Sequence, residues 1–187
     1  DTFYYEEEIK KVLLKEFNIE LSEDVLKECL LSLKEEKEVF INGRRIYLQK
    51  YYLKEKNIAR TLKKIDSYAP KMIYNLDEKL KELENKINID YNFDQEKAIT
   101  TALNNNITII SGGPGTGKTT IINAIVQLYI KEDKLSQADI FQTIALLAPT
   151  GRASKKLSSS THLPASTIHR YLKWYKDSND FFYNEYN

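Results

Sequence analysis

The sequence predicts an α/β protein whose second half alternates helices with strands of a parallel sheet, preceded by a smaller and mostly helical domain. From Asp94 onward, short continuous apolar runs alternate with amphipathic segments, which is typical of strands buried on both faces. Before that point, apolar residues recur at helical spacing around one hairpin signal. We therefore expect domains over residues 1–66 and 91–187, joined by a linker helix within 67–90.

Three amphipathic helices are expected in the first domain. Apolar spacing predicts helices over residues 2–17 and 54–65, and Ser22 is placed to cap a third between them. The single cysteine, Cys29, cannot form an internal disulfide. It lies on the apolar stripe of its helix, so we expect a buried thiol.

A hairpin is predicted over residues 39–48. Two β-prone runs are joined there by Asn42-Gly43, and an Asn-Gly pair favours a type I′ turn. Helices followed by a hairpin indicate a small winged-helix domain. Such domains either read DNA or pack against proteins, and Arg44 and Arg45 at the wing are the features that point to DNA.

Length and composition place few limits on function. The 187 residues, 42% of them hydrophobic, suffice for folded cores. No apolar run approaches the roughly 20 residues of a membrane span, and the start of the chain is not basic and then apolar, so we expect a cytoplasmic protein with no membrane partner. The chain begins at Asp1 without a methionine, and we expect it to be a piece of a longer protein.

The net charge of +1 hides an uneven distribution. Residues 140–176 contain no Asp or Glu. The basic residues of this stretch are Arg152, Lys155, Lys156, Arg170, Lys173 and Lys176. Such a stretch is either a solvated basic face or a groove for a polyanion. Its aromatic residues, Tyr171, Trp174 and Tyr175, could stack bases, but we expect them to be core.

The second domain is expected to form an ordered series of elements. These are a helix capped by Asp94, a strand over 107–110, a helix over 119–130, a strand over 143–148, and helices over about 151–158 and 167–176.

A phosphate-binding loop lies between the first of these strands and the helix that follows it. Gly112 and Gly117-Lys118-Thr119 satisfy the pattern G-x-x-x-x-G-K-[ST]. The glycines allow backbone N–H groups to surround phosphates at a helix N-terminus. Lys118 is then expected to reach the β- and γ-phosphates, and the Thr119 hydroxyl to bind Mg²⁺.

Two further segments narrow the chemistry. Gln95 lies one helix upstream, and its amide can both donate to and accept from an adenine edge. Thr150, Gly151 and Arg152 follow a predicted strand and open a helix, an arrangement that can hold a phosphate.

Taken together, Gln95, GGPGTGKTT (112–120), LAPTGRASKKL (147–157) and STIHR (166–170) resemble, in order and spacing, the first motor domain of superfamily 1 helicases of the 5′-to-3′ branch. The likeness is closest to the RecD-like enzymes, the exodeoxyribonuclease V alpha subunit family. It covers about residues 91–176. Residues before the motor also resemble the helical and winged region of stand-alone RecD-like proteins.

The resemblance implies a P-loop NTPase with a partial RecA-like parallel sheet, acting in DNA repair or recombination with ATP and Mg²⁺ as cofactors. It assigns ATP-Mg²⁺ binding to Gln95, Gly113, Pro114, Gly115, Thr116, Gly117, Lys118, Thr119 and Thr120, with Lys118 and Thr119 catalytic and Thr119 on the metal. It assigns single-stranded DNA binding to Thr150, Gly151, Arg152, Thr167, His169 and Arg170. Helicase or nuclease subunits are implied as partners. One departure is Thr161-His162-Leu163, where the family commonly has Thr-Gly.

Part of the machinery for hydrolysis is missing from the pattern. None of the acidic residues after the loop ends an apolar strand, as an Mg²⁺-binding acid would. The chain stops at Asn187, before the family's Asp-Glu strand is expected, so these residues should bind nucleotide weakly and not unwind DNA. Exonuclease activity is not implied, and two histidines, His162 and His169, make a poor metal site.

Two other functions remain open at this point. One is an ATP-gated regulator whose winged helix binds DNA. The other is a small-molecule or nucleotide kinase, although no second substrate motif accompanies the loop.

Overall fold

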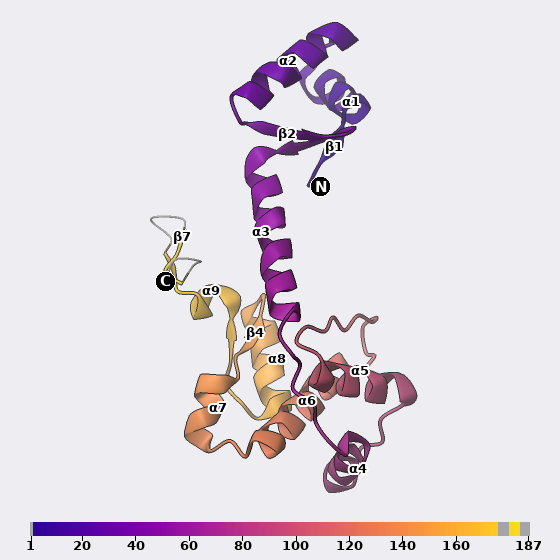
Figure 1. The fold of residues 1–187 in the computed structure, drawn as a ribbon, viewed down its shortest axis with the longest axis vertical. Helices are drawn as coiled ribbons and strands as arrows, with labels where there is room; N and C mark the ends of the chain where they lie inside the picture. Colours follow the sequence, from indigo (N-terminus) through magenta and orange to yellow (C-terminus); the bar gives the residue numbers. More distant parts are fainter. Residues whose placement is uncertain (1, 176–179, 184–187) are drawn as a thin grey trace. The chain divides into compact units, whose positions relative to one another are not determined.

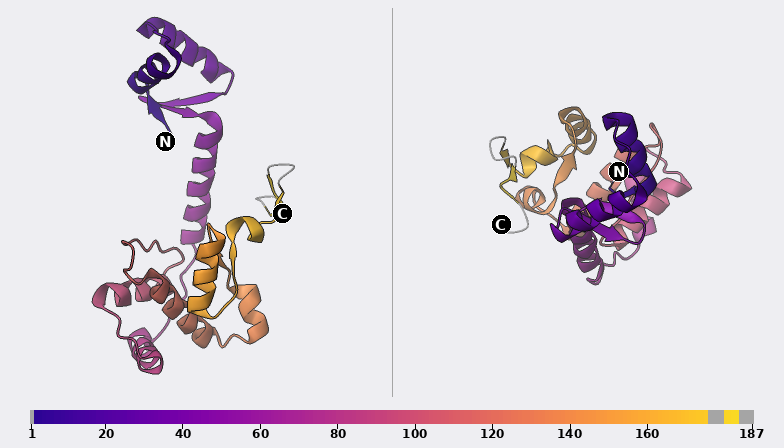
Figure 2. Two further views of the ribbon diagram at one scale, coloured as in Figure 1. Left: turned by 180° about the vertical axis from the view of Figure 1, so that it is seen from behind. Right: turned by 90° about the horizontal axis from the view of Figure 1, so that it is seen from above.

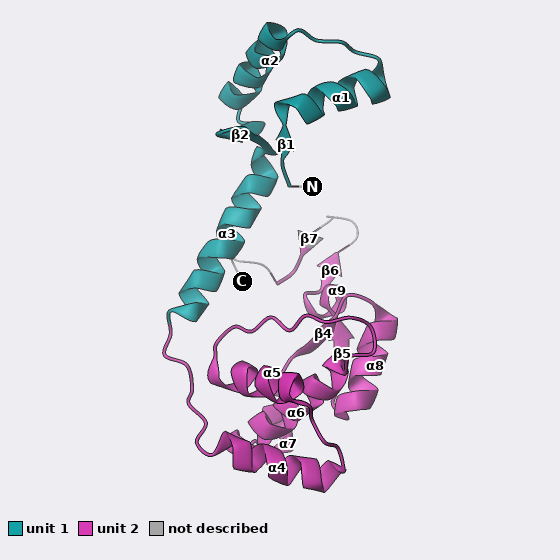
Figure 3. Ribbon diagram, turned by 90° about the vertical axis from the view of Figure 1, so that its right-hand side faces the viewer, with its two compact units in different colours: residues 1–67 teal, residues 68–187 magenta. Residues whose placement is uncertain are grey.

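The computed structural model describes residues 2–175 and 180–183, divided into two compact units, 1–67 and 68–187. Figures 1 and 3 show the elements of each unit. Within the described residues, no helix is long and apolar enough to cross a membrane.

The first unit packs two helices on one face of a small sheet. Its elements are β1 (Tyr4–Tyr5), α1 (Glu6–Phe17), α2 (Glu23–Glu35), β2 (Val39–Asn42), β3 (Arg45–Leu48) and α3 (Gln49–Asp66). The antiparallel strands lie in the order β1-β3-β2. Leu26 and Leu30 of α2 pack against Val39 and Ile46 of the sheet. Ser22 caps α2 as predicted, because its Oγ accepts from the Val25 N–H at 3.3 Å.

The hairpin is present, but its predicted turn is wrong. Asn42 pairs with Arg45, so the two loop residues are Gly43 and Arg44 rather than Asn42 and Gly43. Gly43 has φ +60°, whereas Arg44 is not left-handed. A single positive φ at the first loop residue is the pattern of a type II′ turn, which favours glycine there.

The apolar stripes of this unit are less buried than their spacing suggests. Cys29 is exposed, which contradicts the expected buried thiol. α3 begins at Gln49 instead of 54, and Ile58 is 61% exposed. The α2 stripe is buried only where Leu26 and Leu30 face the sheet, because a core this small covers a narrow part of each helix.

The second unit has a helical core and a short parallel sheet. Its elements are α4 (Leu76–Ile87), α5 (Phe93–Asn104), α6 (Lys118–Asp133), α7 (Gln137–Thr143), β4 (Leu146–Ala148), α8 (Gly151–Thr161), β5 (Ala165–Thr167), α9 (Ile168–Tyr171), β6 (Trp174–Tyr175) and β7 (Asp180–Phe181). Strands β4 and β5 are parallel, and α8 packs against both of them, as Figure 2 shows from behind.

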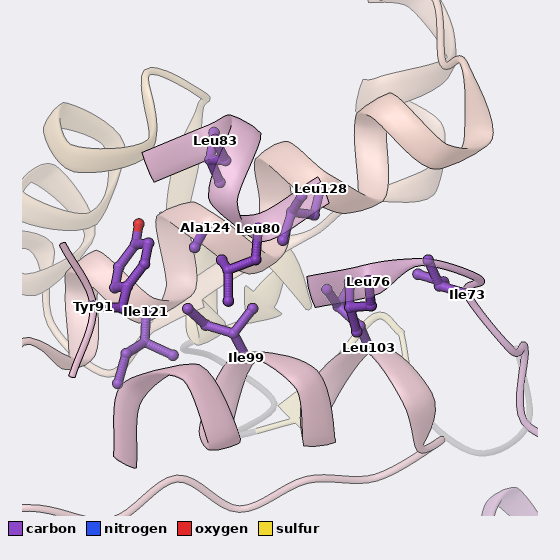
Figure 4. Packing of buried hydrophobic residues seen from close by; sticks show 10 residues of the cluster. All are labelled: Ile73, Leu76, Leu80, Leu83, Tyr91, Ile99, Leu103, Ile121, Ala124 and Leu128. Atoms are coloured by element: carbon purple, nitrogen blue, oxygen red, sulfur yellow. The ribbon is translucent and has the colours of Figure 1, made fainter. Parts of the chain in front are cut away.

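Helices α4, α5 and α6 share the core of this unit. Figure 4 shows Leu80 of α4 and Ile99 of α5 pointing toward one another beside Ala124 of α6. Ile99 and Ala124 are fully buried. The segment predicted as a linker helix is thus α4, and it packs within the second unit.

Several predicted elements of the second unit are wrong. Residues 107–110 form no strand, and Ile109 is 90% exposed. No described strand pairs with this segment, and an extended chain becomes a strand only beside a neighbour that takes its N–H and C=O groups. The strand expected over 143–148 is shortened to β4. The helix expected over 167–176 ends after one turn, where Lys173 has φ +51° and β6 begins; residue 176 lies outside the described residues.

Candidate nucleotide and DNA site

The glycine-rich segment joins the core to the start of α6. Ile110 packs against the core, and Gly117 is the N-cap of α6 with φ +83°. A side chain at this φ is strained, so the position favours glycine, and a Cβ on Gly117 would also displace the Gln95 amide, whose Nε2 would lie 2.5 Å away. The first N–H groups of α6 have no partner within the helix and carry its positive dipole end. They are therefore suited to phosphate oxygens.

Lys118 is folded back onto the loop. Its Nζ donates to the carbonyl oxygens of Gly112 and Gly113, at 2.6 Å each, and lies 3.5 Å from Thr116 Oγ1. The ammonium is thus held against the loop by neutral acceptors. Phosphate oxygens are stronger acceptors for a charged donor, so a bound phosphate would compete for it.

Gln95 is fixed by a capping box at the start of α5. Its N–H donates to Asn92 Oδ1 at 3.0 Å, and the Asn92 N–H donates to Gln95 Oε1 at 3.2 Å. Asn92 is therefore the cap, and the predicted cap at Asp94 is wrong. Gln95 Nε2 also donates to the Thr116 carbonyl at 3.2 Å. The amide keeps one N–H and one lone pair for a base.

A pocket of about 400 Å³ lies beside these groups. Its lining combines Asn92, Asp94, Gln95 and Ala98 of the α5 start with Ile110, Ser111, Gly112, Thr116, Lys118 and Ile121. This volume is within the range of small-molecule sites, about 300–1,000 Å³. Asn92 was not predicted as a site residue, although the N-x-x-Q spacing of a capping box is visible in the sequence.

The other predicted nucleotide residues lie around this pocket. Gly113, Pro114, Gly115 and Thr116 are exposed on the loop, and Thr119 and Thr120 are half-buried in the first turn of α6. Among the described residues, no side-chain hydrogen bond engages the Thr119 hydroxyl. Mg²⁺ binds through few protein oxygens together with phosphates and water, so this donor set fits the ion. Thr119 is the residue that would hold it.

The two predicted DNA segments follow neighbouring parallel strands. Ala148 at the end of β4 pairs with Thr167 at the end of β5. Thr150 caps α8 by accepting from the Ala153 N–H at 3.3 Å, and Thr167 caps α9 by accepting from the Arg170 N–H at 3.2 Å. The carboxyl ends of parallel strands meet at one edge of a sheet, which is where α/β proteins bind ligands. The structure thus brings the two segments together.

Exposed cations and aromatic rings surround this edge. Arg152, His169 and Arg170 are all exposed. Tyr171 and Tyr175 are 50% and 51% exposed, so the expectation that they are core is wrong. Trp174 is half-buried, with its ring 5.9 Å from His169 and 4.6 Å from Phe181. Across the described part of the chain, no group of three His, Cys, Asp or Glu side chains could hold a metal.

The unusual Thr161-His162 turn has a structural explanation. His162 ends α8 with φ +56°, a left-handed conformation that favours glycine. Thr161 is fully buried, and its hydroxyl donates to the Leu157 carbonyl at 2.9 Å. The histidine therefore keeps the turn that a Thr-Gly pair would form, at some cost in backbone strain.

Carboxylates after the loop have structural partners. Asp133 contacts Lys71. Lys79 donates to Glu132, which lowers the pKa of that carboxyl, and Lys71 and Lys131 add to the effect. Ser136 donates to Asp139, which lowers the pKa of this carboxyl at the start of α7. None of the three ends a strand, so none is placed as an acid for hydrolysis.

The chain is similar in sequence to known proteins. Residues 95–187 match the AAA domain family, a class of P-loop NTPases. The RecBCD enzyme subunit RecD of Buchnera aphidicola subsp. Acyrthosiphon pisum is 34% identical over 166 residues, which cover 79% of this chain and 26% of the relative. The chain belongs to the RecD-like family.

Two further relatives match shorter stretches of the RecD-like chain. The RecBCD enzyme subunit RecD of Mycobacterium tuberculosis is 37% identical over 67 residues, 36% of the chain and 12% of the relative. The ATP-dependent RecD2 DNA helicase of Deinococcus radiodurans is 32% identical over 79 residues, 42% of the chain and 10% of the relative. The RecD-like chain spans about a quarter, at most, of the curated relatives it matches.

Proposed function

We propose that these residues are the ATP-binding part of a DNA helicase that couples ATP hydrolysis to 5′-to-3′ movement on single-stranded DNA. In this proposal Lys118 and the N–H groups of the loop bind the phosphates, Thr119 binds Mg²⁺, and Gln95 selects adenine. When bound, the ion would supply positive charge to the β- and γ-phosphate oxygens. The DNA strand contacts residues 150–152 and 167–170.

One observation carries the proposal. The parallel register of β4 and β5 brings two N-capped helix starts, with the exposed cations Arg152 and Arg170, to one sheet edge. α8, which opens at that edge, also packs against α6, which opens at the phosphate loop. One packed pair of helices therefore links the proposed nucleotide and DNA segments and offers a physical route for coupling between them.

The partners of the described carboxylates bear on whether this chain can hydrolyse ATP alone. Glu132, Asp133 and Asp139 already serve ion pairs or a helix cap. We propose that the chain binds nucleotide weakly, and that ATP hydrolysis needs an acidic residue other than these three. A steady-state rate of ATP hydrolysis that equals the rate of a complete DNA-stimulated motor, and that depends on Lys118, would contradict this proposal. We also propose a cytoplasmic protein, with a winged-helix first unit, that works with helicase or nuclease subunits.

Fluorescence anisotropy with a labelled dT20 strand tests the DNA site. Arg152→Gln should weaken binding and lower the slope of log affinity against log salt by about 0.7, the value for one phosphate contact. The control is Lys97→Gln, which removes one exposed charge from α5. Equal binding by both variants and the parent would contradict the proposed groove. Sequence-specific duplex binding that survives Arg152→Ala but not Arg44→Ala would favour the alternative function, an ATP-gated winged-helix regulator that binds DNA.

A further inference from the structure

The sheet of the first unit has two chemically different faces. Val39 and Ile46 point to the face covered by α1 and α2. Strand alternation places Phe40, Arg45 and Tyr47 on the opposite face. Tyr5, which pairs with Arg45, lies on that outer face too, whereas Tyr4 pairs with Ile46 on the helix-covered side.

The outer face is a continuous cluster of aromatic rings. The Phe40 and Tyr52 rings stack at 3.7 Å between centroids, and both approach Tyr47. Phe3 lies 5.5 Å from both Tyr5 and Tyr47. Tyr5 is exposed, at 40%, Phe3, Phe40 and Tyr52 are half-buried, and Tyr47 is buried among them. We call this set, Phe3, Tyr5, Phe40, Tyr47 and Tyr52, the aromatic face.

Cations lie over these rings. The Arg45 guanidinium is 4.8 Å above the Phe3 ring, and hydrogen bonds with Tyr47 and Tyr5 raise its pKa further. The Lys56 ammonium is 5.9 Å from the Tyr52 ring, and Lys50 lies 5.2 Å from the ring of the adjacent Tyr51. The face therefore combines flat apolar surface with positive charge.

Charge in the first unit is segregated. Residues 1–38 hold six Lys or Arg and twelve Asp or Glu, a net charge of −6. Residues 39–67 hold eight Lys or Arg and two Asp or Glu, a net charge of +6. The hairpin and α3 are thus strongly basic in a unit whose total charge is zero. None of these eight cations is in an ion pair within residues 2–175 and 180–183.

We propose that the aromatic face, together with the basic residues Arg44 of the hairpin turn and Lys50 and Lys56 of α3, is a second binding surface for single-stranded DNA. The cations are available to phosphates, because no described carboxylate neutralises them. Single strands use surfaces on which aromatic rings lie beside cations, since any base can stack on a ring that solvent reaches. Tyr5 is the exposed ring of this face, with half-buried rings beside it. Duplex DNA keeps its bases paired and would use the charges alone. The choice of DNA as the polymer rests on the proposed function.

The first test uses the full chain and labelled dT20 at low salt. The triple variant Arg44→Gln, Lys50→Gln, Lys56→Gln should bind roughly tenfold more weakly, with a salt slope lower by about 0.7 for each phosphate that the variant no longer neutralises. The matched control, Lys11→Gln, Lys27→Gln, Lys34→Gln, removes three exposed charges from α1 and α2. An equally large decrease in affinity in the control would overturn the proposal.

The second test separates stacking from charge. Tyr5→Leu should lower the preference for dT20 over an abasic 20-mer roughly fivefold or more, because the abasic strand keeps its phosphates but has no bases. Tyr4→Leu is the control, since Tyr4 is similarly exposed, at 44%, on the other side of the strand. An unchanged preference in Tyr5→Leu would overturn the proposal.

Two outcomes separate this inference from the proposed function. If Arg152→Gln weakens binding and the triple variant does not, this surface is excluded and the groove on the second unit stands. If the triple variant weakens binding and Arg152→Gln does not, the groove fails and this surface stands. A triple variant that loses duplex binding but keeps single-strand binding also overturns the proposal.

Discussion

His162 shows how a single residue carries strain in this chain. Its φ of +56° costs a non-glycine residue about 1 kcal/mol, which glycine largely avoids. His162→Gly should therefore raise the free energy of unfolding by about 0.5–1 kcal/mol. Urea unfolding checks this by a higher midpoint with an unchanged slope. Lys156→Gly, inside α8, should lower the midpoint instead, and a decrease in His162→Gly would contradict the explanation.

Gln95 combines helix capping with the proposed nucleotide contact in one side chain. Gln95→Glu keeps the acceptor for the Asn92 N–H, so α5 should remain capped, but it removes the donor to Thr116 and to a base. Its added negative charge weakens ATP and GTP equally. We expect the ratio of ATP to GTP affinity to fall severalfold, measured by competition against a fluorescent ATP analogue. A ratio equal to that of the parent would exclude Gln95 from base selection.

Ion pairs join α4 to the end of α6 at the scale of elements. Lys79 lowers the pKa of Glu132, and Lys131 lowers that of Glu82, each by a hydrogen bond. A lowered pKa stabilises the fold above the ordinary value of about 4.5, and this contribution is lost as the pH falls through the lowered pKa.

The double variant Lys79→Gln, Lys131→Gln should therefore lose part of the pH dependence of stability. We expect its urea midpoint to change less than that of the parent between about pH 7 and pH 3.5. The control Lys81→Gln, Lys97→Gln removes two charges outside these pairs and should keep the parent's dependence. A parallel decline in all three proteins would contradict a role for the pairs.

Several elements that depend on local signals were predicted well, although the cap of α5 and the start of α3 were misplaced. Ser22 and the 3.6-residue period located α2, and the glycine-rich loop located the start of α6. Elements that depend on a neighbour were not. The apolar run 107–110 was predicted as a strand but has no described pairing partner. The three-residue strand β5 was not predicted, because it is defined only by its pairing with β4. The predicted hairpin turn was one residue too early, because strand register also depends on which side chains face the core.

At the scale of the whole molecule, the candidate site was also predicted where local sequence motifs defined it and missed where it depends on tertiary contacts. Motif spacing singled out Gln95, Lys118 and Arg152, and the family resemblance added Arg170. The bond from Gln95 to Thr116, and the shared sheet edge of the two segments proposed to bind DNA, could be seen only in the tertiary structure. The basic half of the first unit was present in the sequence, but a balanced total charge concealed it. Only the separation of the two sheet faces made the aromatic face apparent.

The central claim is that the loop at Gly112–Thr119 binds the phosphates of ATP. Isothermal titration of Mg-ATP into the chain tests it most directly, with Lys118→Met as the variant and Lys97→Met as the matched control. Lys118 supplies charged hydrogen bonds to phosphate, so its loss should weaken binding on the order of a hundredfold while the control binds like the parent. Mg-ATP binding that is equally tight in Lys118→Met, or absent from the parent, would contradict the account.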